Sequence, residues 1–329
     1  MSQILPSQDL ITKRTGTHST NELFRRSLMS LLSPDTYMNA IPIFVWTGHT
    51  NFGDQLNFDL VQYLGFDYRL VSPKECRLIA IGSILHEFLV RTNHRHRPRS
   101  NNPLFCWGSG FIGDENAIRS LIGEFSWEFN RDIHFRALRG RLSQRMVQYI
   151  TGTSINVPLG DPGLLASSFF KSLPKKYDVG IILHWKEKLS FRQKRQLKLR
   201  KLKVKHISPA QSSAAVVAEL SQCRCVLSSS LHGLVIADSF RIPNMHIITS
   251  DLVEGGSFKF ADYYTCFRDR EYSAIDLRGT TIDSVTIDRI VRSYRFSEEE
   301  LSLVCQRLLA ALPCAGDLVS SGDEHLQSG

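Results

Sequence analysis

The sequence lacks a long apolar run, a signal-like leader and a CxxC pair of cysteines. No stretch of its 329 residues approaches the ~20 apolar residues that a membrane-spanning helix needs. The first residues contain no basic segment followed by a long apolar core, so a secretory signal is not expected. The seven cysteines are odd in number and lack CxxC spacing, which favours reduced thiols over a disulfide framework or a zinc site. We therefore expect a soluble, cytoplasmic protein with no bound metal.

What the sequence does contain is globular composition with a moderate basic excess. Hydrophobic residues make up 42% of the chain and charged residues 22%, which is unlike a disordered protein. The 40 lysines and arginines outnumber the 32 aspartates and glutamates, giving a formal charge of +8. The length is sufficient for two domains.

Short apolar runs, each followed by a polar or glycine-containing turn, recur along the chain. The first series lies at residues 41–46, 78–81, 104–107 and 135–138, with helices expected at 56–64, 83–90 and 142–150. The second series lies at residues 177–183, 203–207, 225–227 and 245–248, with helices expected at 214–220 and 234–240. Strands that are apolar on both faces are typical of parallel sheets covered by helices. We therefore predict an α/β protein of two Rossmann-like domains that face a cleft.

The same pattern suggests domain boundaries. We predict a partly disordered leader at 1–39, an N-terminal domain at 40–172 and a C-terminal domain at 173–312. The C-terminal domain ends in a helix whose start is indicated by Ser297 and the glutamates after it. Residues 313–329 are expected to form a flexible tail.

Asn51, Gly53 and Asp54 occupy the turn after the first predicted strand. A glycine permits a sharp turn there, and the amides of the following helix favour an anion or a carboxylate. Asp54 fits two roles, either the N-cap of that helix, which is the more common role, or a base in the cleft. Gly108 and Ser109 form another turn, which by itself indicates only a turn.

The segment from 228 to 243 is the most informative. A strand ends in a serine-rich turn, and Ser230, Leu231, His232 and Gly233 begin a helix whose free amides suit a phosphate or carboxylate. His232 would lie beside that anion as a proton donor, or it would merely satisfy a local carbonyl. Lys259 follows a glycine-rich stretch and is either a cation of the site or a solvated surface lysine.

Six short motifs occur in one order along the chain. They comprise residues 51–54, 108–110, 139–143, 160–162, 229–233 and 259–263. Together they resemble the polysaccharide pyruvyl transferase family, nearest to its bacterial exopolysaccharide branch, over residues 41–265. The resemblance implies a glycosyltransferase-B-like fold of two Rossmann-type domains. It also implies transfer of the pyruvyl group of phosphoenolpyruvate to a sugar, usually as a cyclic ketal, with phosphoenolpyruvate as co-substrate and no cofactor.

The resemblance further implies roles for single residues. Arg139, His232 and Lys259 would serve the phosphoenolpyruvate site, with His232 as the acid and Asp54 as the base on the acceptor side. The expected substrate-binding residues also include Ser230, Leu231, Gly233, Asn51, Gly53, Gly108 and Ser109. Two positions depart from the family: Ser230 stands where many members have arginine, and Gly140 stands where aspartate is usual. These departures leave donor binding open.

The densest basic segment runs from Arg192 to Lys205, with eight basic residues in fourteen. One interpretation is a solvated helix face followed by an edge strand. Another is docking on an anionic membrane that carries a lipid-linked oligosaccharide acceptor, on the inner face of the plasma membrane. Nucleic acid is not expected, because no aromatic stacking platform accompanies the segment.

Three functions remain open from the sequence. The first is the pyruvyltransferase in exopolysaccharide biosynthesis, and the second is a nucleotide-sugar-dependent glycosyltransferase on the same scaffold. The third is a non-catalytic protein that binds polysaccharide or lipid. Fold alone does not separate them. A carboxylate that clamps a ribose would favour the second, and none is obvious after His232, whereas the retained Arg139, His232 and Lys259 argue against the third.

Overall fold

The structure is a computed structural model that describes residues 40–92, 100–198, 201–268, 270–294 and 297–318. The predicted leader and residues 319–329 of the predicted tail lie outside these ranges. Across the described ranges, no helix combines the length and the apolar character needed to cross a membrane.

The first half of the chain builds a five-stranded parallel sheet in the order β2-β1-β3-β5-β7. Its strands are β1 (Ile41–Ile43), β2 (Tyr68–Leu70), β3 (Leu78–Ile79), β5 (Ser100–Trp107) and β7 (Arg131–Ala137). Its helices are α2 (Phe52–Tyr63), η3 (Leu85–Phe88), α3 (Glu115–Ile122) and α4 (Arg141–Thr151). A separate antiparallel pair joins β4 (Leu89–Arg91) and β6 (Phe125–Phe129). The helix predicted through residue 90 is wrong, because the chain there pairs with β6 after one short 3-10 helix.

The second half builds another five-stranded parallel sheet, in the order β10-β8-β11-β12-β13. Its strands are β8 (Tyr177–Ile182), β10 (Val204–Ile207), β11 (Cys223–Ser228), β12 (Asn244–Ile248) and β13 (Ala274–Asp276). Its helices are α6 (Phe191–Gln196), α7 (Ser213–Ser221), α8 (Leu231–Ser239), α9 (Phe258–Tyr264) and α10 (Ser284–Ser293). A small pair joins β9 (Leu197–Lys198) to β14 (Ile282–Asp283), and η5 (Pro162–Leu165) and α5 (Ala166–Phe169) connect the halves. The prediction of two Rossmann-like α/β halves, as in a glycosyltransferase-B-like fold, is confirmed.

Both sheets share one strand order. Counted along the chain within each sheet, the strands lie in the order 2-1-3-4-5. In such a sheet the connections on either side of the first strand run to opposite faces, and a crevice opens at its carboxyl end. The two crevices lie between the ends of β1 and β3 in the first half and between the ends of β8 and β11 in the second.

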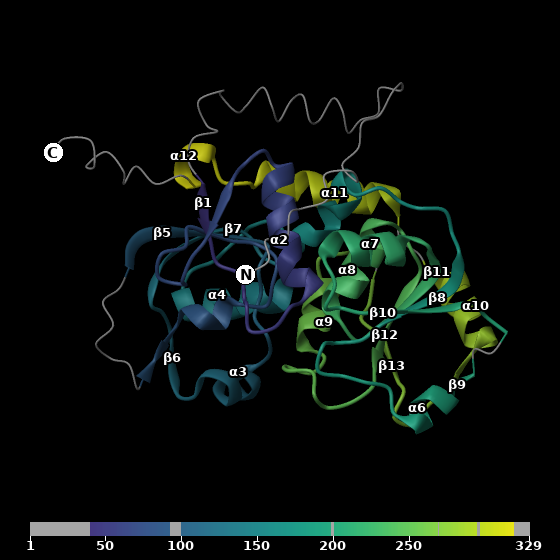
Figure 1. Ribbon diagram of the computed structural model, residues 1–329. Helices are drawn as coiled ribbons and strands as arrows, with labels where there is room; N and C mark the ends of the chain where they lie inside the picture. The colour runs from purple at the N-terminus through teal and green to yellow at the C-terminus, as the bar shows by residue number, and fades with distance from the viewer. Residues whose placement is uncertain (1–39, 93–99, 199–200, 269, 295–296, 319–329) are drawn as a thin grey trace, which may run out of the picture.

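The two halves are packed against each other. The largest buried cluster includes side chains of both, among them Leu56 of α2, Leu164 of η5 and Val235 of α8. Figure 1 shows the two halves side by side, with α2 and α9 lying where they meet. The carboxyl ends of the two sheets are therefore held at fixed positions relative to each other.

The chain then returns to the first half through α11 (Glu298–Ala310) and α12 (Ala315–Leu318), which cross above the two sheets in Figure 1. Trp107 of β5 donates its indole N–H to the Leu308 carbonyl at 2.7 Å. Arg77 donates to the carbonyl of Asp317, and the side chain of Leu318 is fully buried. Residues 315–318 were predicted to belong to a flexible tail, and that prediction is wrong because this short helix packs on the first half.

Candidate functional site

The predicted site residues cluster at the carboxyl ends of the strands. Asn51, Gly53 and Asp54 follow β1, and the 230–233 segment follows β11, so both groups lie beside the crevices that the strand order creates. Gly108 and Ser109 follow β5, Arg139 follows β7, and Lys259 lies in α9, beyond β12.

Asn51, and not Asp54, is the N-cap of α2. The Asn51 side-chain oxygen accepts a hydrogen bond from the Gly53 amide at 3.3 Å, and its amide group donates to the Asp54 carboxylate at 3.0 Å. The N-cap interpretation of Asp54 is therefore wrong. Burial raises the pKa of Asp54 to about 7, against the opposing effects of the Asn51 hydrogen bond and the charge of Lys259. Asp54 is thus a carboxyl group that changes charge near neutral pH.

His232 lies in the first turn of α8 and touches the first half directly. Its side chain is buried, with only 7% of the residue exposed. A Cβ atom placed on Gly53 would lie 1.9 Å from the imidazole Nδ1, so only glycine permits this approach. The Phe52 ring meets the imidazole edge-on at a centroid distance of 6.4 Å. The imidazole is therefore held at the junction of the two halves.

The other imidazole nitrogen faces Asp161. His232 Nε2 lies 3.9 Å from Asp161 Oδ2, and neither buried atom has a hydrogen-bond partner among the described residues. The second Asp161 oxygen accepts from the Gly163 amide at 2.9 Å. Burial raises the pKa of Asp161 to about 6, while burial and the charges of Lys259 and Arg139 lower the pKa of His232 to about 3. Without a bound anion, His232 is neutral at physiological pH.

Lys259 is buried, and the solvated surface-lysine interpretation is wrong. Only 6% of the residue is exposed. Burial and the charge of Arg139 lower the pKa of Lys259 to about 8, against the opposing effects of Glu254, Asp54 and Glu187. The effects of Asp54 and Glu187 show that the ammonium lies within electrostatic reach of groups from both halves. Lys259 therefore brings a desolvated positive charge to the site.

Arg139 is fully buried and joins the halves through an ion pair. Its Nε donates to the Asp262 carboxylate at 3.0 Å, and its Nη2 donates to the Phe111 carbonyl at 2.6 Å. Asp262 also accepts from the amide and the hydroxyl of Ser143. The guanidinium is thus fixed by the protein, and it acts on His232 and Lys259 through its charge.

The departure at Gly140 has a packing reason. A Cβ atom at this position would lie 1.8 Å from the Asp262 carbonyl oxygen, so no larger residue fits without a shift of the backbone. The carboxylate beside Arg139 comes from Asp262 of the second half instead. Asp262 of α9 therefore takes the place of the aspartate that is usual at position 140.

Gly108 and Ser109 support the turn after β5. The Ser109 hydroxyl donates to the Gly82 carbonyl at 2.8 Å, and the Ser109 carbonyl accepts from the Arg139 amide. Gly108 has a φ of +94°, and a Cβ atom there would lie 2.3 Å from Pro162. The hydroxyl thus holds the turn, the Ser109 carbonyl binds the backbone of Arg139, and the part of both residues in binding substrate stays a prediction.

Three residues around His232 differ in their contacts. Ser230 is the N-cap residue of α8 but makes no side-chain capping bond. Leu231 is buried. Gly233 lies so close to β11 that a Cβ atom would come within 2.3 Å of the Ser228 hydroxyl. Gly233 therefore permits close packing of α8. The Ser230 amide donates to the Ser228 hydroxyl, and the Ser230 side chain caps none of the helix amides that follow it.

Sequence reasoning missed the carboxylates that organise this region. Asp161 and Asp262 lie within recognised motifs, but their partners are distant in the chain. Glu187 lies in no motif, and it accepts hydrogen bonds from the hydroxyls of Ser229, Thr249 and Ser250. Because both Glu187 oxygens are engaged by protein hydroxyls, this carboxylate joins the loops of the second sheet.

Within the ranges given above, no group of three or more histidine, cysteine, aspartate or glutamate side chains is arranged to hold a metal ion. All seven cysteines lie in these ranges, and all are free thiols.

One family model matches more than half of the chain. A model of the polysaccharide pyruvyl transferase family matches residues 49–251. The succinoglycan biosynthesis protein ExoV of Rhizobium meliloti (strain 1021) is 25% identical over 224 residues, covering 68% of this chain and 63% of that protein. The chain thus matches less than two thirds of that relative's length. A crystal structure of a functionally uncharacterised protein from Klebsiella pneumoniae aligns with a TM-score of 0.40 and 11% identity, over 75% of this chain and 94% of the other.

Proposed function

Because the chain belongs to the polysaccharide pyruvyl transferase family, we propose that it transfers the pyruvyl group of phosphoenolpyruvate to a sugar of an exopolysaccharide or its lipid-linked precursor. The product would be a pyruvate ketal. The name of the relative places that protein in succinoglycan biosynthesis, which supports an exopolysaccharide as the acceptor here. One observation carries the proposal: the buried imidazole of His232 lies with Lys259 and Asp54 at the junction of the two halves.

Donor binding follows from charge. Phosphoenolpyruvate carries about three negative charges near neutral pH, and paired cations and helix amides stabilise such an anion. Lys259 supplies a desolvated ammonium, and the first turn of α8 supplies amides that Ser230 leaves uncapped. Arg139 contributes its charge from a fixed position, because its donors are engaged by Asp262 and other groups. Because Ser230 stands where many family members have arginine, the site has one cation fewer, and Lys259 and Arg139 are the two that it keeps.

The donor also prepares the acid. An anion beside His232 opposes the charges of Lys259 and Arg139, which raises the pKa of the imidazole above its unliganded value of about 3. His232 takes up a proton and donates it to C3 of phosphoenolpyruvate, leaving positive charge at C2. Asp161, 3.9 Å from Nε2, stabilises the imidazolium. Donor binding and proton uptake are therefore coupled.

Bond making then involves the acceptor. A sugar hydroxyl attacks C2 and loses its proton to Asp54, whose pKa of about 7 suits a general base. The bond between C2 and the phosphate oxygen breaks, and inorganic phosphate leaves with its negative charge stabilised by Lys259. A second hydroxyl of the same sugar bonds to C2 and closes the ketal, and its proton goes to the departing phosphate.

The experiment is a transfer assay with phosphoenolpyruvate labelled in its pyruvyl carbons. The protein is incubated with the label and lipid-linked oligosaccharides from an exopolysaccharide-producing bacterium, and both phosphate release and label in the saccharide are measured. We expect both, in equal amounts, and neither with the His232→Ala variant. Phosphate release without labelled saccharide would contradict ketal transfer.

The rival glycosyltransferase is tested in the same assay by replacing the donor with labelled UDP-hexose. A nucleotide-sugar site needs a carboxylate that is free to bind a ribose, and Glu187 of the second half is engaged by three protein hydroxyls. Hexose transfer with no pyruvyl transfer would replace the proposal by this rival. Binding of saccharide with transfer of neither group would favour a non-catalytic protein.

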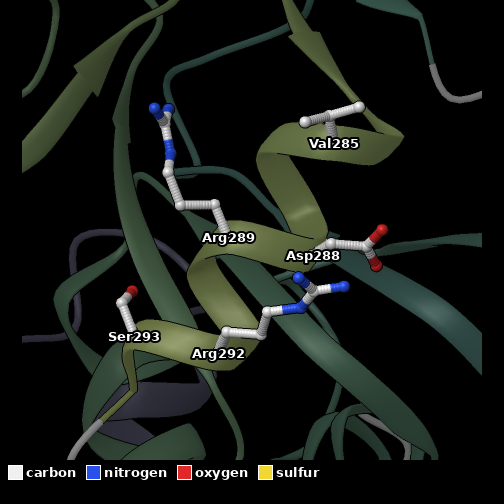
Figure 2. Close-up of a pocket in the computed structure, with 5 residues that line it drawn as sticks. All are labelled: Val285, Asp288, Arg289, Arg292 and Ser293. Carbon is white, nitrogen blue, oxygen red and sulfur yellow. The ribbon is translucent and has the colours of Figure 1, made fainter.

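The basic segment supports a further part of the proposal, peripheral contact with an anionic membrane. In α6 the Phe191 side chain is 78% exposed and lies among the exposed Arg192, Lys194 and Arg195. Through β9 and β14 this helix connects to α10, where Val285 is 71% exposed. Figure 2 shows Val285 near one end of α10, with four further side chains along the same helix that line a hollow of about 550 Å³: Asp288, Arg289, Arg292 and Ser293. Leu199 and Arg200 of the predicted segment lie outside the described residues.

This contact is tested by sedimentation with liposomes that contain phosphatidylglycerol. The double variant Arg192→Glu/Arg195→Glu should lose most binding at low salt, because each basic residue near an anionic surface contributes about 1 kcal/mol. The matched control, Lys171→Glu/Lys176→Glu, makes the same change of charge elsewhere on the surface and should retain binding. Equal loss in both would leave α6 as ordinary solvated surface.

A further inference from the structure

Four aromatic rings from two loops gather beside the proposed catalytic groups. Trp46 and His49 lie in the loop after β1, and His184 and Trp185 lie in the loop after β8. The His49 and Trp185 ring centroids are 3.9 Å apart, and those of Trp46 and Trp185 are 6.1 Å apart. We call Trp46, His49 and Trp185 the aromatic platform. The platform brings together the loop after the first strand of one sheet and the loop after the first strand of the other.

The platform is built into the loops and is open to solvent. His49 is exposed, and both tryptophans are partly exposed. Gly48 allows the first loop to fold over Trp46, because a Cβ atom on Gly48 would lie 2.3 Å from the indole. Lys186 lies 5.0 Å from the Trp185 ring centroid and forms an ion pair with Glu254. Two indoles are therefore held in place without being buried in the core.

The platform is also adjacent to the chemistry. The loop that contains His49 ends at Asn51, which binds the Asp54 carboxylate. The backbone amide of His184, next to Trp185, donates a hydrogen bond to the Ser229 hydroxyl at 2.9 Å, and Ser229 lies in the turn before α8. The charge of Lys259 contributes to lowering the pKa of His184, so the second loop lies within electrostatic reach of that ammonium. A molecule that reaches Asp54 from solvent passes these rings.

We propose that the aromatic platform binds the acceptor saccharide, with one pyranose ring stacked on Trp46 and Trp185. The C–H groups on a pyranose face carry partial positive charge and complement the negative face of an indole. The two indoles carry no charge, and the neighbouring Lys186 is paired with Glu254, which suits a neutral sugar better than the anionic donor. This inference rests on the proposed function, since it names the acceptor side of the same site.

Binding is measured separately from turnover, by quenching of tryptophan fluorescence with acceptor oligosaccharides. Saccharide should quench the wild-type protein and the Trp127→Phe variant equally, and it should quench Trp185→Phe less. In the transfer assay, Trp185→Ala should raise the KM for acceptor about tenfold, with little change in the affinity for phosphoenolpyruvate measured by calorimetry. Tyr149→Ala, which removes an aromatic ring that is 71% exposed elsewhere, is the matched control.

The outcomes separate the two proposals. An unchanged KM for acceptor in Trp185→Ala, in an enzyme that transfers pyruvate, would overturn the platform and leave the function intact. Saccharide quenching that depends on Trp185, in a protein that transfers no pyruvate, would overturn the function and support the platform. Quenching by free UDP and not by saccharide would assign the rings to a nucleobase and overturn the platform. If Trp185→Ala melts at a lower temperature than the wild type, Trp185→Phe replaces it in both assays.

Discussion

The two halves of this protein share one strand order but carry different chemistry at the same topological point. In the first half, the loop after β1 presents Asp54, a carboxyl group whose pKa lies near neutrality. In the second half, the helix after β11 begins with uncapped amides and His232. The strand order therefore determines where a ligand binds, and the side chains after the strands determine what is bound.

A second difference concerns how each half uses its neighbour. His232 of the second half depends on the first, because Gly53 leaves space for the imidazole and Asp161 faces its Nε2. Arg139 of the first half depends on the second, because Asp262 supplies its carboxylate. Each half thus supports a site residue of the other. We therefore expect that a variant in one half will change the activity or the stability that depends on the other half.

The largest effect is expected from His232→Ala, which removes the acid of the second half. Phosphate release from phosphoenolpyruvate in the presence of acceptor should fall by at least ~100-fold, because general acid catalysis contributes about 10²–10⁴-fold. His206→Ala, at an exposed histidine of β10 in the same half, is the matched control and should retain activity. Turnover of His232→Ala near the wild-type rate would remove the imidazole from the mechanism.

The next effect is on stability, from Asp262→Asn. This change leaves the Arg139 guanidinium buried without its counter-ion, which costs about 3–5 kcal/mol of unfolding free energy. The loss is measured by urea denaturation. Glu115→Gln, which breaks an exposed pair with Arg119 in the first half, should leave the unfolding midpoint unchanged. Equal midpoints in the two variants would show that Arg139 does not depend on the second half.

A smaller effect is expected from Gly53→Ala, which tests the contact between the halves directly. The added methyl group would displace the His232 imidazole, and we expect kcat to fall by about tenfold or more, since small misplacement of catalytic groups is costly. Gly316→Ala adds the same group at a site with open space around it and serves as the control. Full activity in Gly53→Ala would mean that the imidazole has room to move without loss of function.

The strands and the place of the site were predictable because both depend on local pattern. Apolar runs such as residues 41–46 and 177–183 predict parallel strands, and ligands bind beyond their carboxyl ends. His232 was therefore placed at a helix start from the sequence alone. The short helix at 315–318 was not predicted, because four residues are too few to show a helical periodicity.

The partners of the site residues were not predictable, because they are far away in the chain. Arg139 and Asp262 are separated by 123 positions, and nothing near Arg139 in the sequence indicates its counter-ion. Lys259 is equally hidden, since a lysine in a glycine-rich stretch has the pattern of a solvated residue. Burial of these charges follows only from how the two halves pack, and a single sequence does not contain that information in local form.

The smallest effect expected is the dependence of kcat/KM for the acceptor on pH, measured at saturating phosphoenolpyruvate so that His232 already holds its proton, and in this profile each half controls one limb. Asp54 must lose its proton to act as a base, so kcat/KM should rise through about pH 7. Lys259 must keep its proton to bind the donor, so kcat/KM should fall above about pH 8. At pH 6 the value should be roughly one tenth of the maximum. Asp54→Asn should remove the rising limb and keep the falling one, whereas a variant that keeps both limbs would assign the lower pKa to another group. Such a result would move the origin of the rising limb away from the carboxyl group on the acceptor side of the site.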